Sequence, residues 1–219
     1  MAIAIGTRTT ANVAPGATSY TFAHSHNVGA DGVLLVALCM SNTVNYTGVT
    51  YNGVAMTERL NYNSTELSQR WAFYELASPA TGSNNVIISF TGSQWNPISA
   101  TAQSFTGATT GGAIGNNDAA STPHSQTLTI ATNSIIYLMG ISTQTQSFGY
   151  DINGSTRTNL FAHNTNRQVE AALSATGIGA GSIACVTKAD FAIISNVRIE
   201  IREGGGGSGI AEGNWIMVF

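Results

Sequence analysis

The sequence contains very little charge. Charged residues make up 9% of its 219 residues, whereas about a quarter is usual in globular domains. The one lysine, Lys188, and the seven arginines are scattered along the chain, and the formal net charge is −3. Because proteins bind nucleic-acid phosphates through clustered cations, we expect no nucleic-acid partner. The polar surface must consist of Ser, Thr, Asn, Gln and Gly, which lose water at lower cost than charges and suit contacts with neighbouring subunits or sugars.

The sequence also lacks a long hydrophobic run. A membrane-spanning helix needs about 18 or more apolar residues, and the longest apolar run here, Val33–Met40, has the length of a β-strand. The N-terminal residues Met1–Gly6 include no basic residue of the kind that begins a secretion signal. We therefore expect no membrane partner and a protein made in the cytosol, as a virion component assembled in the host cytoplasm would be. An extracellular surface is the alternative location.

Cysteine is scarce. The two cysteines, Cys39 and Cys185, both lie in apolar segments, which favours small buried thiols. A disulfide that joins two parts of the fold is the alternative. Their spacing excludes a CxxC redox or zinc motif.

Catalytic motifs are missing as well. No G-x-S-x-G sequence occurs. Gly204, Gly206 and Gly209 match the spacing of G-x-G-x-x-G, but that motif binds phosphate only between a strand and a helix, and no helical pattern follows here. The carboxylates considered for a glycosidase pair are Glu58, Glu66 and Glu75. Such a pair is defined by the distance between the two carboxylates, which sequence alone does not give. Because no catalytic motif is present, we expect no enzyme activity, no catalytic residue and no cofactor.

Two histidines stand close together in an apolar-polar alternating segment. His24 and His26 are two residues apart, so on a strand both side chains project to one face. Two ligands are too few for a tetrahedral metal site, and His124 or His163 would have to converge on them. We interpret the pair as polar side chains of a strand face and expect no metal.

What the sequence does contain is a series of short strand-like runs between turn clusters, without convincing 3.6-residue periodicity. The expected strands are Ser19–His26, Val33–Met40, Val44–Tyr51, Val54–Leu60, Arg70–Leu76, Val86–Thr91, Ile98–Phe105, Ser125–Ile130, Ser134–Ile141, Ile183–Val186 and Phe191–Arg202. A short helix competes over Gln168–Ala175, but the glycines that follow favour strand and turn. The pattern predicts an all-β fold, an antiparallel two-sheet β-sandwich of about 9–11 strands.

Three segments carry more specific expectations. Asn52-Gly53 is a strong two-residue hairpin signal, and Val33–Met40 is apolar on both faces, as in a central strand covered on each side. Phe191–Arg202 alternates apolar residues with Asn196, Arg198, Glu200 and Arg202, which indicates a charged solvent face. The polar stretch Thr106–Pro123 is expected to be a long surface loop.

The C-terminal end differs in composition from the rest. Gly204–Gly207 begins a flexible hinge, and the chain then ends in an apolar peptide. We divide the sequence into one β-sandwich domain, residues 1–203, and a hinge with a docking peptide, residues 204–219. The candidate subunit-docking residues are Trp215, Ile216, Met217, Val218 and Phe219. Because exposure of these side chains would leave a sticky patch, they pack either on their own domain or on a neighbouring subunit by strand addition.

Aromatic residues offer a second kind of contact. Trp71 and Phe73 share one face of a predicted strand and are expected in the core. Trp95, beside Gly92 and Pro97 in a loop, is the candidate glycan contact.

The order and spacing of several segments resemble a family of jelly-roll-like β-sandwich modules found in phage structural proteins and bacterial surface proteins. The segments that carry the resemblance are Tyr20–Val28, Asp31–Leu38, Val49–Thr57, Tyr74–Gly82, Asn85–Ser89, Ser104–Gly107 and Asp190–Ile201. The resemblance covers about residues 17–203 and implies a jelly-roll-like fold in a virion or extracellular setting. It supplies no catalytic residues.

Together these features predict a non-enzymatic virion structural protein: a capsid decoration or cement subunit, a head-fibre or tail component, or a small jelly-roll coat protein. The expected partners are copies of itself, with a trimer as a plausible symmetry, and other capsid or tail proteins. A carbohydrate-binding or adhesive module that contacts a surface glycan is the alternative. A subunit of an extracellular filament is a further alternative.

Overall fold

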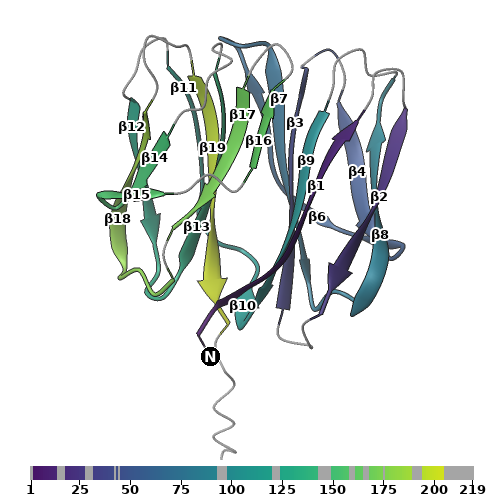
Figure 1. Cartoon of the computed structure of the whole chain (residues 1–219), viewed down its shortest axis with the longest axis horizontal. Coiled ribbons are helices and arrows are strands. Elements are labelled where there is room, and N and C mark those ends of the chain that lie inside the picture. The colour runs from purple at the N-terminus through teal and green to yellow at the C-terminus, as the bar shows by residue number, and fades with distance from the viewer. Residues whose placement is uncertain are drawn as a thin grey trace, which may run out of the picture.

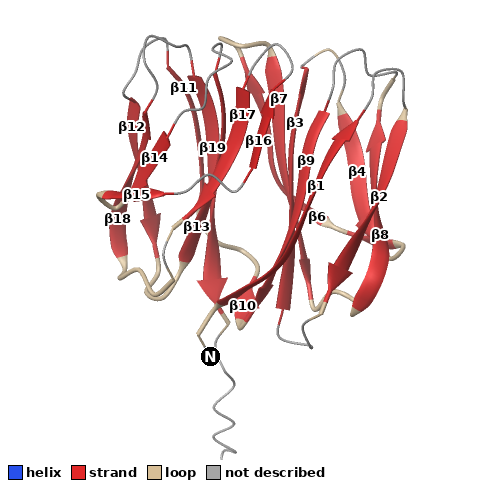
Figure 2. Ribbon diagram, in the orientation of Figure 1, coloured by secondary structure: helices blue, strands red, loops and turns tan. Residues whose placement is uncertain are grey.

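The computed structural model of the chain is built from strands. It describes residues 2–13, 18–27, 32–41, 43, 45–92, 98–119, 124–142, 149–157, 161–164, 168–174, 176–188 and 194–204. Within these residues there are strands and turns and no helix (Figure 2), so the predicted all-β class is confirmed. In the described part of the chain, accordingly, no helix has the length and apolar character needed to cross a membrane.

The first nine strands span the N-terminal half of the chain. They are β1 (Ala4–Val13), β2 (Ser19–His26), β3 (Gly32–Ser41), β4 (Tyr46–Tyr51), β5 (Val54–Ala55), β6 (Thr57–Ser64), β7 (Gln69–Ala77), β8 (Gly82–Phe90) and β9 (Ile98–Thr106). They form a first inner sheet, in the order β1-β9-β3-β7-β6, and a first outer sheet, in the order β2-β8-β4-β5.

The remaining strands form two more sheets. They are β10 (Ala108–Thr109), β11 (Ile114–Ala119), β12 (His124–Ile130), β13 (Ile135–Ser142), β14 (Gly149–Ile152), β15 (Ser155–Arg157), β16 (Phe161–Asn164), β17 (Gln168–Leu173), β18 (Gly181–Lys188) and β19 (Ile194–Glu203). A second inner sheet has the order β19-β13-β17-β16, with β10 and β11 both paired to β19, and a second outer sheet has the order β12-β18-β14-β15. Figure 1 shows the four layers side by side, with the two inner sheets in the middle.

The two halves repeat one arrangement. If β1–β9 are matched in order with β11–β19, the strand orders of the inner sheets coincide, and so do those of the outer sheets. Each half also has the same tight hairpin: Asn52-Gly53 joins β4 to β5 with φ of 50° and 75°, and Asn153-Gly154 joins β14 to β15 with φ of 55° and 71°. Positive φ at both positions is what such two-residue hairpins require. The predicted hairpin at Asn52-Gly53 is confirmed, and the chain is a tandem structural repeat.

Three apolar cores fill the spaces between the four layers. The central core lies between the inner sheets and includes Trp71, Phe73 and Tyr137. The other two cores lie between each inner sheet and its outer sheet. Alternate residues of β3 face two different cores, Leu35 the central one and Leu34 the first outer one. This explains the uninterrupted apolar run, and it confirms that this strand is covered on both faces.

The number of sheets and strands differs from the prediction. Four sheets replace the expected two, and 19 strands replace the expected 9–11. The physical reason is the repeat: each half supplies two sheets, and the second half contains short strands, such as β14–β16, that carry little apolar pattern. That residues 1–203 make a single domain stays a prediction, although the central core joins the two halves.

Much of the stretch expected to be a long loop is strand. Within Thr106–Pro123, β10 and β11 both pair with β19. Glycine permits this, because a Cβ on Gly112 would lie 1.8 Å from the backbone oxygen of Glu200, and one on Gly115 would lie 2.7 Å from Nε of Arg198. The Gly-rich composition therefore marks a close approach of backbones and not a loop.

Most of the expected solvent face of the last strand is buried. Asn196, Arg198 and Glu200 are at most 5% exposed, because they point to the second outer sheet, whereas Arg202 is exposed, as predicted. Gln168–Leu173 is a strand, so the competing helix is not formed.

The central core includes one hydrogen bond between the halves that can be tested. Nε1 of Trp71 on β7 donates to Oγ of Ser195 on β19 at 2.8 Å, and both residues are fully buried. We expect Trp71→Phe to lower the free energy of unfolding by about 1–3 kcal/mol, because a buried hydroxyl loses its partner. Chemical denaturation of Trp71→Phe, Ser195→Ala and the double variant measures this; costs that simply add would contradict a coupled pair.

Candidate functional site

Two histidines and two hydroxyls form a buried cluster between the first outer and first inner sheets. On β2, Nε2 of His24 and Nδ1 of His26 each lie 2.8 Å from Oγ of Ser104 on β9. Nδ1 of His24 also lies 2.9 Å from Oγ1 of Thr9 on β1. The histidines share one face, as predicted, but that face is at most 1% exposed.

The cluster forms a continuous hydrogen-bonded chain. The Ser104 hydroxyl has one proton, so it donates to one ring and accepts from the other. Burial, and secondarily the neighbouring His26, lower the pKa of His24 from 6.5 to about 4. His24 is therefore uncharged at neutral pH.

A serine beside a histidine is also the arrangement of a nucleophile and its base. Here Ser104 is fully buried, so a substrate has no approach to its hydroxyl. Among the described residues, no group of three or more His, Cys, Asp or Glu side chains could hold a metal ion. What the contacts do is fasten the edge strand β2 to β1 and β9.

The second half shows that this position does not need histidine. The equivalence follows from the matched hairpins and the strand registers. The chains of paired residues are Tyr51, Val86 and Phe22 in the first half, and Ile152, Cys185 and Gln126 in the second. Phe22 is therefore equivalent to Gln126. Counting two residues further along each strand matches His24 with Leu128, and counting four matches His26 with Ile130. Leu128 and Ile130 are both buried apolar residues, so the fold itself does not demand the histidine pair.

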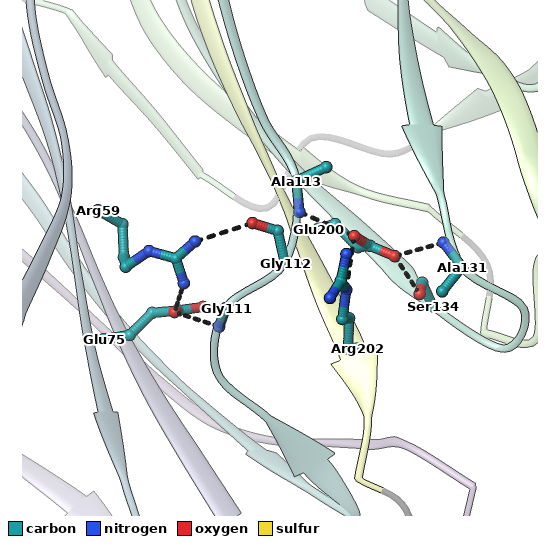
Figure 3. A network of polar contacts seen from close by, with 9 residues as sticks. All are labelled: Arg59, Glu75, Gly111, Gly112, Ala113, Ala131, Ser134, Glu200 and Arg202. Carbon is teal, nitrogen blue, oxygen red and sulfur yellow. Dashed lines mark hydrogen bonds and ion pairs between the residues drawn. The ribbon is translucent and has the colours of Figure 1, made fainter.

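A second polar cluster surrounds the crossover between the halves, at Gly111–Ala113 (Figure 3). Glu75 on β7, 1% exposed, accepts from Nη1 of Arg59 at 2.5 Å and from the backbone N–H of Gly111 at 3.1 Å. The other guanidinium nitrogen, Nη2, donates to the backbone oxygen of Gly112 at 2.9 Å. Burial raises the pKa of Glu75, against the opposing effects of Gly111 and Arg59.

Glu200 on β19 holds the other side of the crossover (Figure 3). Its carboxylate is fully buried and accepts from the N–H groups of Ala113 at 2.8 Å and Ala131 at 2.6 Å, and from the hydroxyl of Ser134 at 2.6 Å. Nε of Arg202 is 3.1 Å away. Although burial alone would raise it, these donors together hold the pKa of Glu200 below its usual value. The carboxylate thus stays charged and ties the crossover to the second half.

The three carboxylates considered from the sequence have separate roles. Glu58 accepts from the hydroxyl of Tyr74 at 2.7 Å, whereas Glu75 points to the opposite face of the sheet, toward the crossover. Glu66 is exposed. Cys39 and Cys185 are buried thiols that form no disulfide, as predicted.

Other predicted residues fall outside the described part of the chain. These are Trp95, the candidate glycan contact, and the docking residues Trp215, Ile216, Met217, Val218 and Phe219. The side chains of His124 and His163 are likewise outside it. Trp71 and Phe73 are fully buried, as predicted.

Sequence reasoning missed Thr9, Arg59, Ser104 and Glu200. They have partners on other segments of the chain, which strand periodicity does not identify. The repeat, visible in the two Asn-Gly turns, could have predicted the second outer sheet that covers Glu200. Comparison with protein-family models, with curated proteins and with solved structures gives no match for this chain.

The histidine cluster predicts a specific dependence of stability on pH. Because the pKa of His24 is 6.5 unfolded and about 4 folded, the unfolded chain binds more protons between these values. The contribution of His24 is therefore complete above about pH 6.5 and is lost as the pH falls toward 4. We expect His24→Leu, the residue of the second half, to flatten this part of the curve in urea denaturation. An unchanged slope would contradict the assignment.

The crossover predicts a steric result. Gly112→Ala places a Cβ 1.8 Å from the Glu200 oxygen, so the crossover must shift away from β19. We expect the free energy of unfolding to fall by about 3 kcal/mol or more. Gly179→Ala is the matched control, because a Cβ there meets open space; equal losses in the two variants would refute the close approach.

Proposed function

We propose that this chain is a non-enzymatic structural subunit of a virion: a phage capsid decoration or cement protein, a head-fibre or tail component, or a small coat protein. The proposal rests chiefly on one observation, the absence of charge from the strands of the first outer sheet. Across that sheet, one row of outward side chains runs Thr21, Ile87, Thr50 and Ala55.

The second outer sheet supports the same interpretation. Its exposed or half-buried outward residues include Ser125, Thr127, Thr129, Ser182 and Ala184, together with one acidic residue, Asp151. Both outer faces therefore consist largely of small hydroxyl-bearing or apolar side chains. Since the centres of protein interfaces are depleted in charge, such faces suit packing against other subunits.

The connectivity supports the proposal as well. In each half, the inner-sheet order β1-β9-β3-β7 faces the outer-sheet order β2-β8-β4-β5, or its equivalent. We infer that each half is jelly-roll-like, an architecture used by viral capsid and lectin domains. The charges of the described core, such as those of Glu75 and Glu200, are committed to internal contacts.

Assembly of the full chain tests the proposal. We expect the purified protein to form a homo-oligomer of defined mass and to decorate particles of its virion, observed by mass photometry and electron microscopy. Deletion of residues 205–219 is expected to abolish assembly while the melting temperature changes little. A full chain that stays monomeric at every concentration and binds no particle would overturn the proposal.

A further inference from the structure

The edge of β2 differs from every other sheet edge in the described part of the chain. Natural proteins protect sheet edges by shortness, charge, bulges or cover. The edge strands β5, β10, β15 and β16 have at most four residues. Bulges interrupt β1 beside Arg8 and β6 beside Glu58, and Asp118 of β11 accepts from the N–H of Thr65. β2 has eight residues, no charge and no bulge.

The equivalent edge in the second half has a hydrogen-bond donor at its centre. Nη2 of Arg198 donates to the backbone oxygen of Thr127 on β12 at 3.3 Å. Thr127 corresponds to Ala23, the central exposed residue of β2. Of these two equivalent edges, that of β12 has a side-chain donor at its centre, and we call it the capped edge. No such contact to Ala23 of β2 is seen within the residues that the structure describes.

The backbone of β2 presents its remaining polar groups outward. The N–H of Phe90 donates to the oxygen of Thr18, and in an antiparallel ladder every second residue faces the partner. The even-numbered residues of β2 thus pair with β8. The N–H and C=O groups of Thr21, Ala23 and Ser25 point away from it, toward the position of an added strand.

An apolar seam lies beside these groups. Tyr20 and Phe22 point inward from β2 but are only partly buried, and their rings are 6.1 Å apart. At the same positions the second half has His124 and Gln126. A strand added to β2 would cover the two aromatic rings with its own inward side chains, so the site fits an apolar segment.

The sequence contains such a segment on a suitable tether. The described chain ends at Gly204, whose N–H donates to the oxygen of Gly107. Gly107 follows Thr106, and Thr106 pairs with Gly32. Gly32 in turn lies against the ring of His26, the last residue of β2. The end of the described chain is thus connected to the end of β2 through a short series of contacts. Ten residues, 205–214, then precede Trp215–Phe219. Gly-rich sequences of ten residues have a typical end-to-end span of about 16–19 Å.

We propose that the edge of β2 is the acceptor for residues 215–219 of a neighbouring copy, which add to the first outer sheet as a strand. This rests on the proposed homo-oligomeric function and identifies its contact. Backbone hydrogen bonds from Thr21, Ala23 and Ser25 provide the pairing, and Tyr20 with Phe22 receive the apolar side chains.

Ala23→Pro tests the acceptor directly. Proline removes an N–H that points away from β8 and leaves the pairing with β8 intact. We expect the dissociation constant of the assembly to rise at least about tenfold. Thr127→Pro, at the equivalent position of the capped edge, is the matched control and should assemble normally. Should Ala23→Pro fail to fold by circular dichroism, Phe22→Gln, which installs the second half's residue, replaces it.

Complementation distinguishes donation between copies from docking within one copy. A chain lacking residues 205–219 keeps its acceptor, and the Ala23→Pro chain keeps its tail. Neither alone should assemble, and an equimolar mixture should give one-to-one heterodimers by mass photometry. No heterodimer would overturn the exchange of tails between copies.

The two proposals can fail separately. If tail deletion abolishes assembly but Ala23→Pro and Phe22→Gln do not, the acceptor lies elsewhere and the structural function stands. If the unaltered full chain neither assembles nor binds particles, the proposed function itself fails.

Discussion

The rest of the structure depends on the contact between the two inner sheets. Each inner sheet has an outer sheet on its other face, so the central core makes strands such as β3 and β19 inaccessible on both sides. Polar residues on those strands must then find partners inside the protein. The four donors around Glu200 follow from this requirement, as does the hydrogen bond from Trp71 to Ser195.

Some of this could be predicted from the sequence, and the reason differs from segment to segment. The continuous apolar run of β3 and the Asn-Gly turn are local signals, and both predicted the structure correctly. The burial of Arg198 and Glu200 is not local, because it depends on the packing of β19 against the second outer sheet, which the residue pattern of β19 alone does not reveal. Likewise, Gly112 resembles a loop residue until the backbone of β19 is placed against it. The two Asn-Gly turns are the sequence signal of the repeat, because they have identical residues in both halves, whereas the residues of the equivalent strands differ.

For the buried cluster, the sequence predicted only half of the arrangement. That His24 and His26 share a face follows from strand periodicity. Their shared partner, Ser104, lies about 80 residues away and on another sheet, so periodicity cannot identify it. The second half provides the comparison that a single sequence otherwise lacks. Where it has Leu128 and Ile130, stability comes from apolar packing, whereas the first half accepts a pH-sensitive polar contact at the same place.

The tandem arrangement also has a consequence for how the protein is made. The first half can be completed once Thr106 has left the ribosome, since β9 can then pair with β1. Its inner face, with Trp71 and Phe73, has no cover until the second half follows from the ribosome. Nascent chains on one messenger therefore present identical apolar surfaces to each other during that interval, and pairing between them would compete with correct folding. The short crossover at Gly111–Ala113 counters this, because it keeps the proper partner at high local concentration.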